Sequence, residues 1–201
     1  RRANPGDDFL STLILAEDEG SKLSNLEMCA LVGAVLGAGS DTAVDLHSYL
    51  IKNLLQHPDE LDLLKSDPSL VQGAISETLR YESSGKTGLA RYASEDLEIN
   101  GHFVKKGQMV QLITSTAGMD SSIYNEPRKF DIQRDHDKSI SFGQGPHYCI
   151  GVTLVRSQTE VMLKELFKRF PNLSLGDEIV YDYNHHNARR MDVMTVETRI
   201  S

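Results

Sequence analysis

The chain has 201 residues, of which 39% are hydrophobic and 25% are charged, a composition that predicts a globular protein with one substantial core. Its formal net charge of −8 argues against a nucleic-acid partner, because such a partner requires a basic face that displaces counterions from phosphates. The longest apolar run, near residues 30–38, is interrupted by Gly33 and Gly37, so we expect no membrane span.

The first element with a clear start is a long helix expected over residues 24–56. Ser24 and Glu27 have the spacing of a capping box, which satisfies two backbone N–H groups at a helix start. Pro58 marks the end, because the residue before a proline is biased away from helical backbone angles. Three glycines, at positions 33, 37 and 39, each cost about 1 kcal/mol relative to alanine inside a helix, which predicts a local reason for them.

Two shorter helices are expected next, over residues 58–64 and 67–81. The second has Asp67 in the capping position and Pro68 in the first helical position, where its missing N–H is not needed. Both helices therefore have clear starts.

The middle of the chain is expected to form strands. Residues 97–99 and 102–104 flank Asn100-Gly101, the pair typical of a type I′ hairpin turn, and an apolar strand is expected near residues 109–113. Apolar residues recur at helical spacing from Val155 to Phe170, which predicts a helix that ends at Pro171.

A glycine-rich loop with one cysteine, FGQGPHYCIG at residues 142–151, directly precedes that helix. The glycines allow sharp turns and close approach to a flat ligand, and the N-terminal amides of the helix favour a thiolate. The pattern predicts that Cys149 is a metal ligand held as a buried anion. Two alternatives remain: Cys149 packs as a small hydrophobe, or it joins His147, His185 and His186 in a zinc site.

These residues resemble the haem-thiolate loop of the cytochrome P450 monooxygenases, FxxGxxxCxG, in the fuller form FGxGxHxCxG. The resemblance implies haem b as cofactor and Cys149 as the iron ligand. His147 and Arg91 are candidates to bind the haem propionates, because each offers charge-assisted hydrogen bonds to a carboxylate. Other cofactor-binding residues implied are Phe142, Gly143, Gly145, Ile150 and Gly151 in the loop, and Ala38 and Gly39 in the long helix.

The long helix also carries Asp41 and Thr42, an acid beside an alcohol. In the resembling family this AGxDT segment crosses the distal face of the haem at a widened turn and delivers protons during oxygen activation, which implies that both residues are catalytic. An ordinary polar helix surface is the alternative.

Glu77 and Arg80 lie three residues apart, a spacing that by itself means a modest exposed ion pair. The family has such an ExxR pair joined by a further arginine before the cysteine loop, and Arg134 occupies that position. The resemblance therefore implies a three-member structural charge network. It also places Val35, Thr87, Gly88 and Leu89 in the substrate pocket.

The fold expected is mainly α with a small β portion, and the whole chain, 1–201, is expected to be the C-terminal part of a single cytochrome P450 domain of the soluble bacterial type, without its upstream half. Departures from the family pattern occur at Ser84, Gly118, Met119, Val155 and Gln158. They bear on packing more than on chemistry.

The function expected is insertion of one oxygen atom from O2 into a small organic substrate. Electrons would come from a separate ferredoxin- or flavodoxin-type partner, because no nicotinamide or flavin fingerprint is present. A ligating thiolate cannot also form a disulfide, so with two cysteines in the chain we expect a cytoplasmic protein. The rival functions are a peroxygenase or rearrangement catalyst on the same haem, and a catalytically incomplete haem-binding remnant that needs an N-terminal half.

Overall fold

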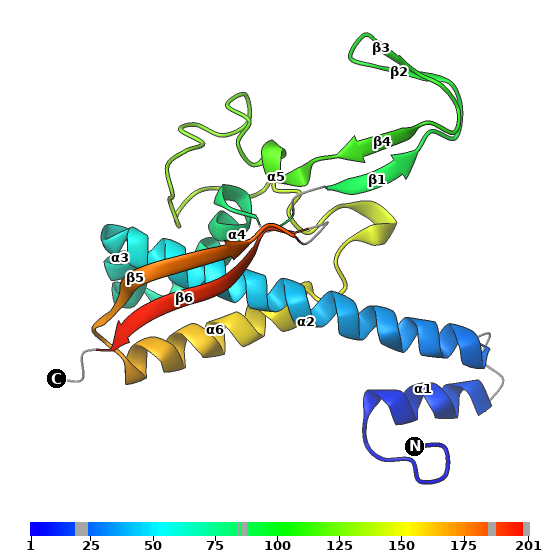
Figure 1. Ribbon diagram of the computed structural model, residues 1–201, viewed down its shortest axis with the longest axis horizontal. Helices are drawn as coiled ribbons and strands as arrows, with labels where there is room; N and C mark the ends of the chain where they lie inside the picture. The colour runs from blue at the N-terminus through cyan, green and yellow to red at the C-terminus, as the bar shows by residue number, and fades with distance from the viewer. Residues whose placement is uncertain (19–23, 84, 86–87, 185–187, 199–201) are drawn as a thin grey trace. The chain divides into compact units, whose positions relative to one another are not determined.

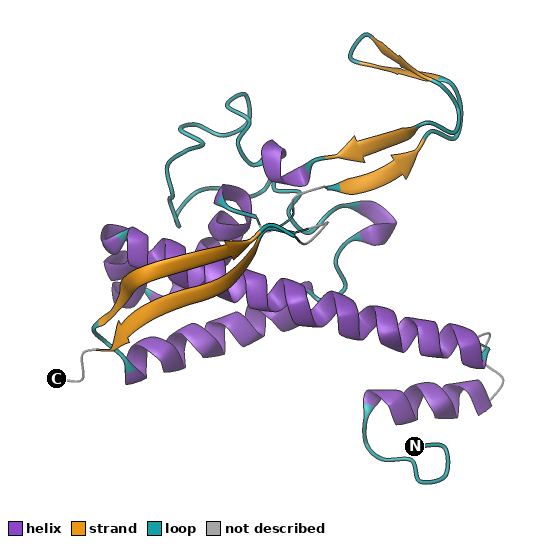
Figure 2. Cartoon of the chain, in the orientation of Figure 1, coloured by secondary structure: helices purple, strands orange, loops and turns teal. Residues whose placement is uncertain are grey.

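The computed structural model describes residues 1–18, 24–83, 85, 88–184 and 188–198. Helices dominate, and the strands described form three separate two-stranded antiparallel ladders, β1 with β4, β2 with β3, and β5 with β6 (Figures 1 and 2). The elements are α1 (Phe9–Asp18), α2 (Asn25–Gln56), α3 (Pro58–Ser66), η1 (Pro68–Leu70), α4 (Val71–Tyr81), β1 (Leu89–Tyr92), β2 (Leu97–Ile99), β3 (His102–Val104), β4 (Met109–Leu112), α5 (Thr114–Ala117), η2 (Gly145–His147), α6 (Val152–Arg169), β5 (Leu173–Asp182) and β6 (Arg190–Thr198). The predicted class, mainly α with a small β portion, is confirmed.

The chain divides into two compact units, residues 1–43 and 44–201, and α2 contributes to both. The assignment of the whole chain to one domain stays a prediction. In the first unit the expected capping box is present: the Ser24 N–H donates to the Glu27 carboxylate at 2.8 Å, and the Glu27 N–H donates to Ser24 Oγ at 3.3 Å. These bonds start α2 where the sequence predicts.

The glycines of α2 do not interrupt it. A Cβ at Gly33, Gly37 or Gly39 would meet nothing within 4 Å, so the residues that the structure describes supply no packing reason for them. Among those residues, α2 is the one helix long and apolar enough to cross a membrane by length and composition. The expectation that no segment has the length and apolar composition of a membrane span is therefore wrong, because Gly33, Gly37 and Gly39 do not break the helix.

The second half of α2 instead supplies the core of the second unit. Leu50 and Leu54 are completely buried, which is typical of a core helix in a folded protein. The buried apolar cluster draws on α2, α3, α4, α6 and the segment before the cysteine loop, and consists of Leu46, Leu50, Leu54, Leu61, Leu64, Val71, Ala74, Ile75, Phe130, Ile132 and Leu163.

The predictions for α3, α4, β2, β3, β4 and α6 are confirmed with one difference at α4, whereas no bounds were predicted for α1, α5, β5 and β6. The helix expected over 67–81 begins as the 3-10 turn η1, because Asp67 accepts the Ser69 N–H at 3.0 Å and tightens the first turn. Strand β1 was not predicted as a strand, and pairs with β4. The hairpin turn between β2 and β3 has positive φ at both Asn100 (49°) and Gly101 (79°), as a type I′ turn requires.

Candidate functional site

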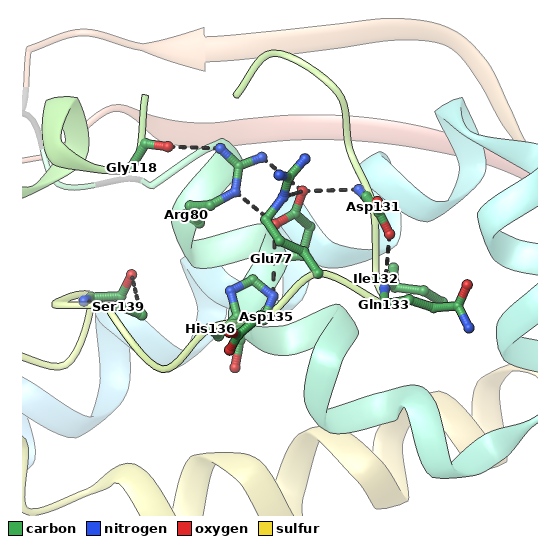
Figure 3. A network of polar contacts seen from close by, with 12 residues as sticks. Glu77, Arg80, Gly118, Asp131, Ile132, Gln133, Asp135, His136 and Ser139 are labelled. Carbon is green, nitrogen blue, oxygen red and sulfur yellow. Dashed lines mark hydrogen bonds and ion pairs between the residues drawn. The ribbon is translucent and has the colours of Figure 1, made fainter. Parts of the chain in front are cut away.

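The charge network of Glu77, Arg80 and Arg134 lies in the second unit, and Glu77 and Arg80 at its centre are buried. Glu77 and Arg80 are 0% and 2% exposed, and two guanidinium nitrogens of Arg80, Nε and Nη2, each donate to one Glu77 carboxylate oxygen at 2.7 Å (Figure 3). Arg134 Nε lies 3.3 Å from the same carboxylate. The structure thus brings together the three side chains that the sequence singles out, and the pair is not the exposed contact that i,i+3 spacing alone predicts.

Arg80 also binds backbone carbonyls of an irregular segment. Its Nη1 donates to the carbonyl oxygens of Gly118 and Pro127, each at 2.7 Å, and its Nη2 donates to that of Lys129 at 3.1 Å. All five N–H directions of a guanidinium can be used this way, which a lysine could not match. A Cβ at Gly118 would clash with the Arg80 carbonyl oxygen, so this departure from the family pattern allows a close approach.

Arg134 also binds backbone carbonyls, and it shares the Lys129 carbonyl with Arg80. It donates to the carbonyl oxygens of Asn125 at 2.6 Å and Lys129 at 3.1 Å. The Asp131 N–H donates to Glu77 at 2.9 Å, which adds a neutral donor to the carboxylate. Glu77 therefore faces two guanidinium groups and one amide.

His136 is a member of this network that sequence reasoning missed. Its Nε2 lies 3.7 Å from a Glu77 carboxylate oxygen, and Figure 3 shows the ring facing that carboxylate. Burial lowers the pKa of His136 below its ordinary value, and the opposing effect of Glu77 is smaller. His136 stands two residues after Arg134, and a lone histidine in a polar segment carried no signal that could have found it.

The cysteine loop is held by its own backbone. The Cys149 N–H donates to the Phe142 carbonyl at 2.9 Å, and the Tyr148 N–H donates to the Gly145 carbonyl at 3.0 Å. Gly143 and Gly145 have φ of 75° and 70°, in the left-handed region that favours glycine. A Cβ on Gly151, the residue before α6, would lie 3.9 Å from Cys149 Sγ, so the sulfur sits at the N-terminus of α6.

Cys149 is exposed, which contradicts the expectation of a buried anion. The neighbouring residues of the loop, 144–150, are all exposed as well, so they do not cover the sulfur. Ile150 is 96% exposed, and His147, in η2, is exposed as well. Of the proposed zinc ligands, His185 and His186 lie outside the described residues; within the part of the chain that is described, no three His, Cys, Asp or Glu side chains gather as a metal site.

Arg156 is a second residue that the sequence did not single out. Its guanidinium donates to Gln72 at 2.8 Å and to Ser76 at 3.2 Å, both on the α4 side, and lies 5.4 Å from the centroid of the Phe142 ring. It therefore connects the start of the cysteine loop to α4.

Most of the other expected site residues that the structure describes are exposed, and Gly88 is half-buried. Arg91 is within strand β1 rather than before the strands, and its Nη1 donates to the Ala90 carbonyl at 2.9 Å. Leu89 begins the same strand, and Gly88 precedes it with φ of 73°. Thr87 lies outside the described residues. Val35, Ala38 and Gly39 are exposed on the first-unit part of α2.

Asp41 and Thr42 are also exposed on α2. Thr42 Oγ1 donates to the Ala38 carbonyl at 2.6 Å, and the α-helix continues through these residues without the widened turn expected from the family. The threonine hydroxyl is satisfied one turn back along its own helix, as is common for threonine in helices.

A cysteine on a glycine loop before a helix, together with a buried glutamate bound by two arginines, defines the class of haem-thiolate proteins. The sequence model of cytochrome P450 matches residues 65–182. The chain therefore belongs to the cytochrome P450 family, and members of this family bind haem b.

Similar proteins extend the comparison to nearly the whole chain. The epothilone C/D epoxidase of Sorangium cellulosum is 40% identical over 197 residues, which are 98% of this chain and 47% of that protein. The 6-deoxyerythronolide B hydroxylase of Saccharopolyspora erythraea is 39% identical over 185 residues, 90% of this chain and 46% of that protein. The crystal structure of epothilone D-bound cytochrome P450epoK has a TM-score of 0.94 at 40% identity and covers 100% of this chain, which corresponds to 50% of that structure.

The chain thus spans about half the length of the relatives it matches, and the matched part is their C-terminal half. A TM-score of 0.94 over this length agrees with the predicted arrangement of long helix, ExxR helix, hairpin, cysteine loop and final helix.

Proposed function

We propose that this chain carries the thiolate side of a haem monooxygenase that inserts one oxygen atom from O2 into a small organic substrate. The observation that carries the proposal is Cys149: an exposed thiol on a loop with two left-handed glycines, with its sulfur at the N-terminus of α6. The names of two relatives, an epoxidase and a hydroxylase, describe reactions of this type in those proteins.

The loop residues fit haem. An exposed sulfur flanked by an almost fully exposed isoleucine offers both a ligand for iron and an apolar contact for a flat ring. The helix N-terminus favours the negative charge of the thiolate, and the glycines leave room for close approach. Bound haem would supply the activation of dioxygen, and its electronic properties would depend on the thiolate ligand.

Several charged and polar side chains would orient the cofactor and move protons. His147 and Arg91, both exposed, are proposed to donate to the propionates. Asp41 and Thr42 are proposed to pass protons. The Thr42 hydroxyl donates to the Ala38 carbonyl but keeps lone pairs that can accept a hydrogen bond from a neighbouring donor.

The electron source is proposed to be a separate ferredoxin- or flavodoxin-type protein, and the location is proposed to be the cytoplasm. The substrate pocket is proposed to include Val35, Thr87, Gly88 and Leu89.

The test uses the two exposed cysteines as a matched pair. Protein reconstituted with haem, reduced and exposed to carbon monoxide should give the strongly red-shifted Soret band of a thiolate-ligated haem. Cys149→Ser should abolish this band, and Cys29→Ser should retain it. Survival of the band in Cys149→Ser would show that Cys149 is not the ligand.

The proton relay has a separate test. Thr42→Ala and Asp41→Asn should keep the carbon monoxide spectrum but lower the product formed per electron consumed, because they remove proton delivery without touching the thiolate. Unchanged product per electron in both variants would remove these residues from the mechanism.

A second candidate function is a haem-binding portion that becomes an oxygenase only together with an N-terminal half. It is favoured by the match to about half of each relative and by exposed apolar side chains on α6, where Leu154 is 63% and Val161 is 62% exposed. Haem retention and substrate oxidation should be measured for this chain with and without the N-terminal half of the epothilone epoxidase. Oxidation by this chain unaided would reject the second candidate.

A further inference from the structure

A polar cleft of about 580 Å³ lies in the second unit, outside the cysteine loop. Its lining includes three cationic side chains, Lys52, Arg128 and Arg189, and one acidic side chain, Glu82; the other lining residues are uncharged. The cleft therefore has two positive charges in excess, in a chain whose formal net charge is −8.

The single carboxylate of the cleft is already shared between two cations. Lys52 Nζ and Arg189 Nη2 each bind one oxygen of Glu82, and the Glu82 side chain is 17% exposed. One negative charge thus faces two positive charges at close range, so the pair of cations is only half neutralised.

Both cations are also fixed in place by tyrosines. Arg189 Nε donates to the Tyr49 hydroxyl at 3.0 Å, and Lys52 Nζ donates to the Tyr181 hydroxyl at 3.3 Å. The Lys52 side chain is only 6% exposed. Cationic groups held rigidly beside a cleft bind an incoming anion with little loss of side-chain entropy.

Arg128 contributes the second excess charge. It is exposed at the cleft, and among the residues that the structure describes it forms no ion pair or hydrogen bond. A guanidinium without a partner presents five N–H donors in the planar arrangement that suits phosphate oxygens.

We propose that this cleft binds a doubly charged anion, namely the phosphate group of a small phosphorylated molecule. Two excess positive charges match the charge of a phosphate monoester at neutral pH, and arginine recognises its oxygens in a bidentate manner. A volume of about 580 Å³ is within the range of small-molecule sites and exceeds what a bare phosphate fills, so an organic portion fits beside the phosphate. The inference does not depend on haem binding or on the proposed oxygenase function.

The experiment is an isothermal titration calorimetry measurement, in which inorganic phosphate is added to the protein. The protein is first placed in a phosphate-free buffer of low ionic strength. Arg128→Gln should weaken binding by about ten- to hundredfold, the range expected for loss of hydrogen bonds from a charged group. Lys129→Gln is the matched control, because it removes the same charge from the adjacent residue, whose ammonium lies 3.9 Å from Asp131 and does not line the cleft. It should change affinity less than twofold.

Circular dichroism melting of both variants verifies that each is folded before titration. Equal weakening by Arg128→Gln and Lys129→Gln would mean a diffuse charge effect and would overturn the proposal. Absence of phosphate binding at millimolar concentration, or equal displacement by chloride at matched ionic strength, would overturn it as well.

Discussion

Replacing Glu77 by alanine should be among the most destabilising single changes in this protein. The carboxylate is 0% exposed and faces the guanidinium groups of Arg80 and Arg134. Its removal leaves Arg80, with a side chain that is 1% exposed, as a buried charge without a counterion. We expect a loss of about 3–5 kcal/mol in the free energy of unfolding, as is typical when one partner of a buried ion pair is removed.

The magnitude can be resolved with a double-mutant cycle. Glu77→Ala, Arg80→Ala and the double variant should be unfolded in urea and followed by far-ultraviolet circular dichroism. At a slope of about 2 kcal/mol per molar urea, a loss of 4 kcal/mol shifts the midpoint by about 2 M. The double variant should be less destabilised than the sum of the single variants, because the buried charge of Arg80 is removed together with its counterion and only the less buried Arg134 loses its partner.

The control is Arg169→Ala, which breaks the i,i+4 pair with Glu165, where the two side chains are 70% and 42% exposed. That change should cost no more than about 1 kcal/mol. If Glu77→Ala costs no more than the Arg169 control, the inference that a buried charge is stranded is wrong. If Glu77→Ala yields no soluble protein, Glu77→Gln should be measured in its place. Glutamine keeps the shape of the side chain and has one oxygen acceptor and one NH2 donor, so the loss in the free energy of unfolding should lie between those of the Arg169 control and Glu77→Ala.

Three further predictions concern single side chains. Gly118→Ala should destabilise the protein by at least about 1 kcal/mol in the same urea assay, because the new Cβ clashes with the carbonyl oxygen of Arg80; wild-type stability would refute that contact. Because burial lowers the pKa of His136, the unfolded chain binds its proton first as the pH falls below about 6.5, so the free energy of unfolding should decline from pH 7 toward pH 5. His136→Asn should reduce the slope of the free energy of unfolding against pH by up to about 1.4 kcal/mol per pH unit. Equal slopes in the wild-type protein and the variant would contradict the lowered pKa of His136. Glu82→Gln should cost about 1–3 kcal/mol and should speed hydrogen exchange in β5 and β6, since it removes the counterion of Lys52; unchanged exchange would argue against that contact.

Local signals in the sequence predicted most of the secondary structure. The capping box at Ser24 fixed the start of α2, and Asn100-Gly101 fixed the hairpin between β2 and β3, because in both cases the residues that determine the backbone are neighbours in the sequence. Strand β1 was missed because its partner, β4, lies about twenty residues further along the chain, and a four-residue strand has no strong periodicity of its own.

The residues of the charge network could be predicted only where a sequence motif of the family includes them. Glu77 and Arg80 are adjacent on a helix, and Arg134 could be added only through the family resemblance, because no local pattern connects residues 57 positions apart. His136 was missed for the same reason. The exposure of Cys149 could not be predicted either, since burial depends on which elements pack over the loop and not on the loop's own residues.

Residues 118–144 contain no helix or strand, yet Arg80 and Arg134, the latter itself part of this segment, bind its carbonyl groups at Gly118, Asn125, Pro127 and Lys129. Every amino acid offers the same carbonyl oxygen, so this mode of attachment is indifferent to the side chains that the segment displays. Exposed positions whose side chains bind no backbone group, unlike Asp120 and Asp135, can therefore accept substitutions, and they are the natural places to attach a fluorophore or an affinity tag. The buried side chains of Tyr124, Phe130 and Ile132 anchor the same segment in the interior. The shape of the segment therefore depends on these side chains as well as on Arg80 and Arg134.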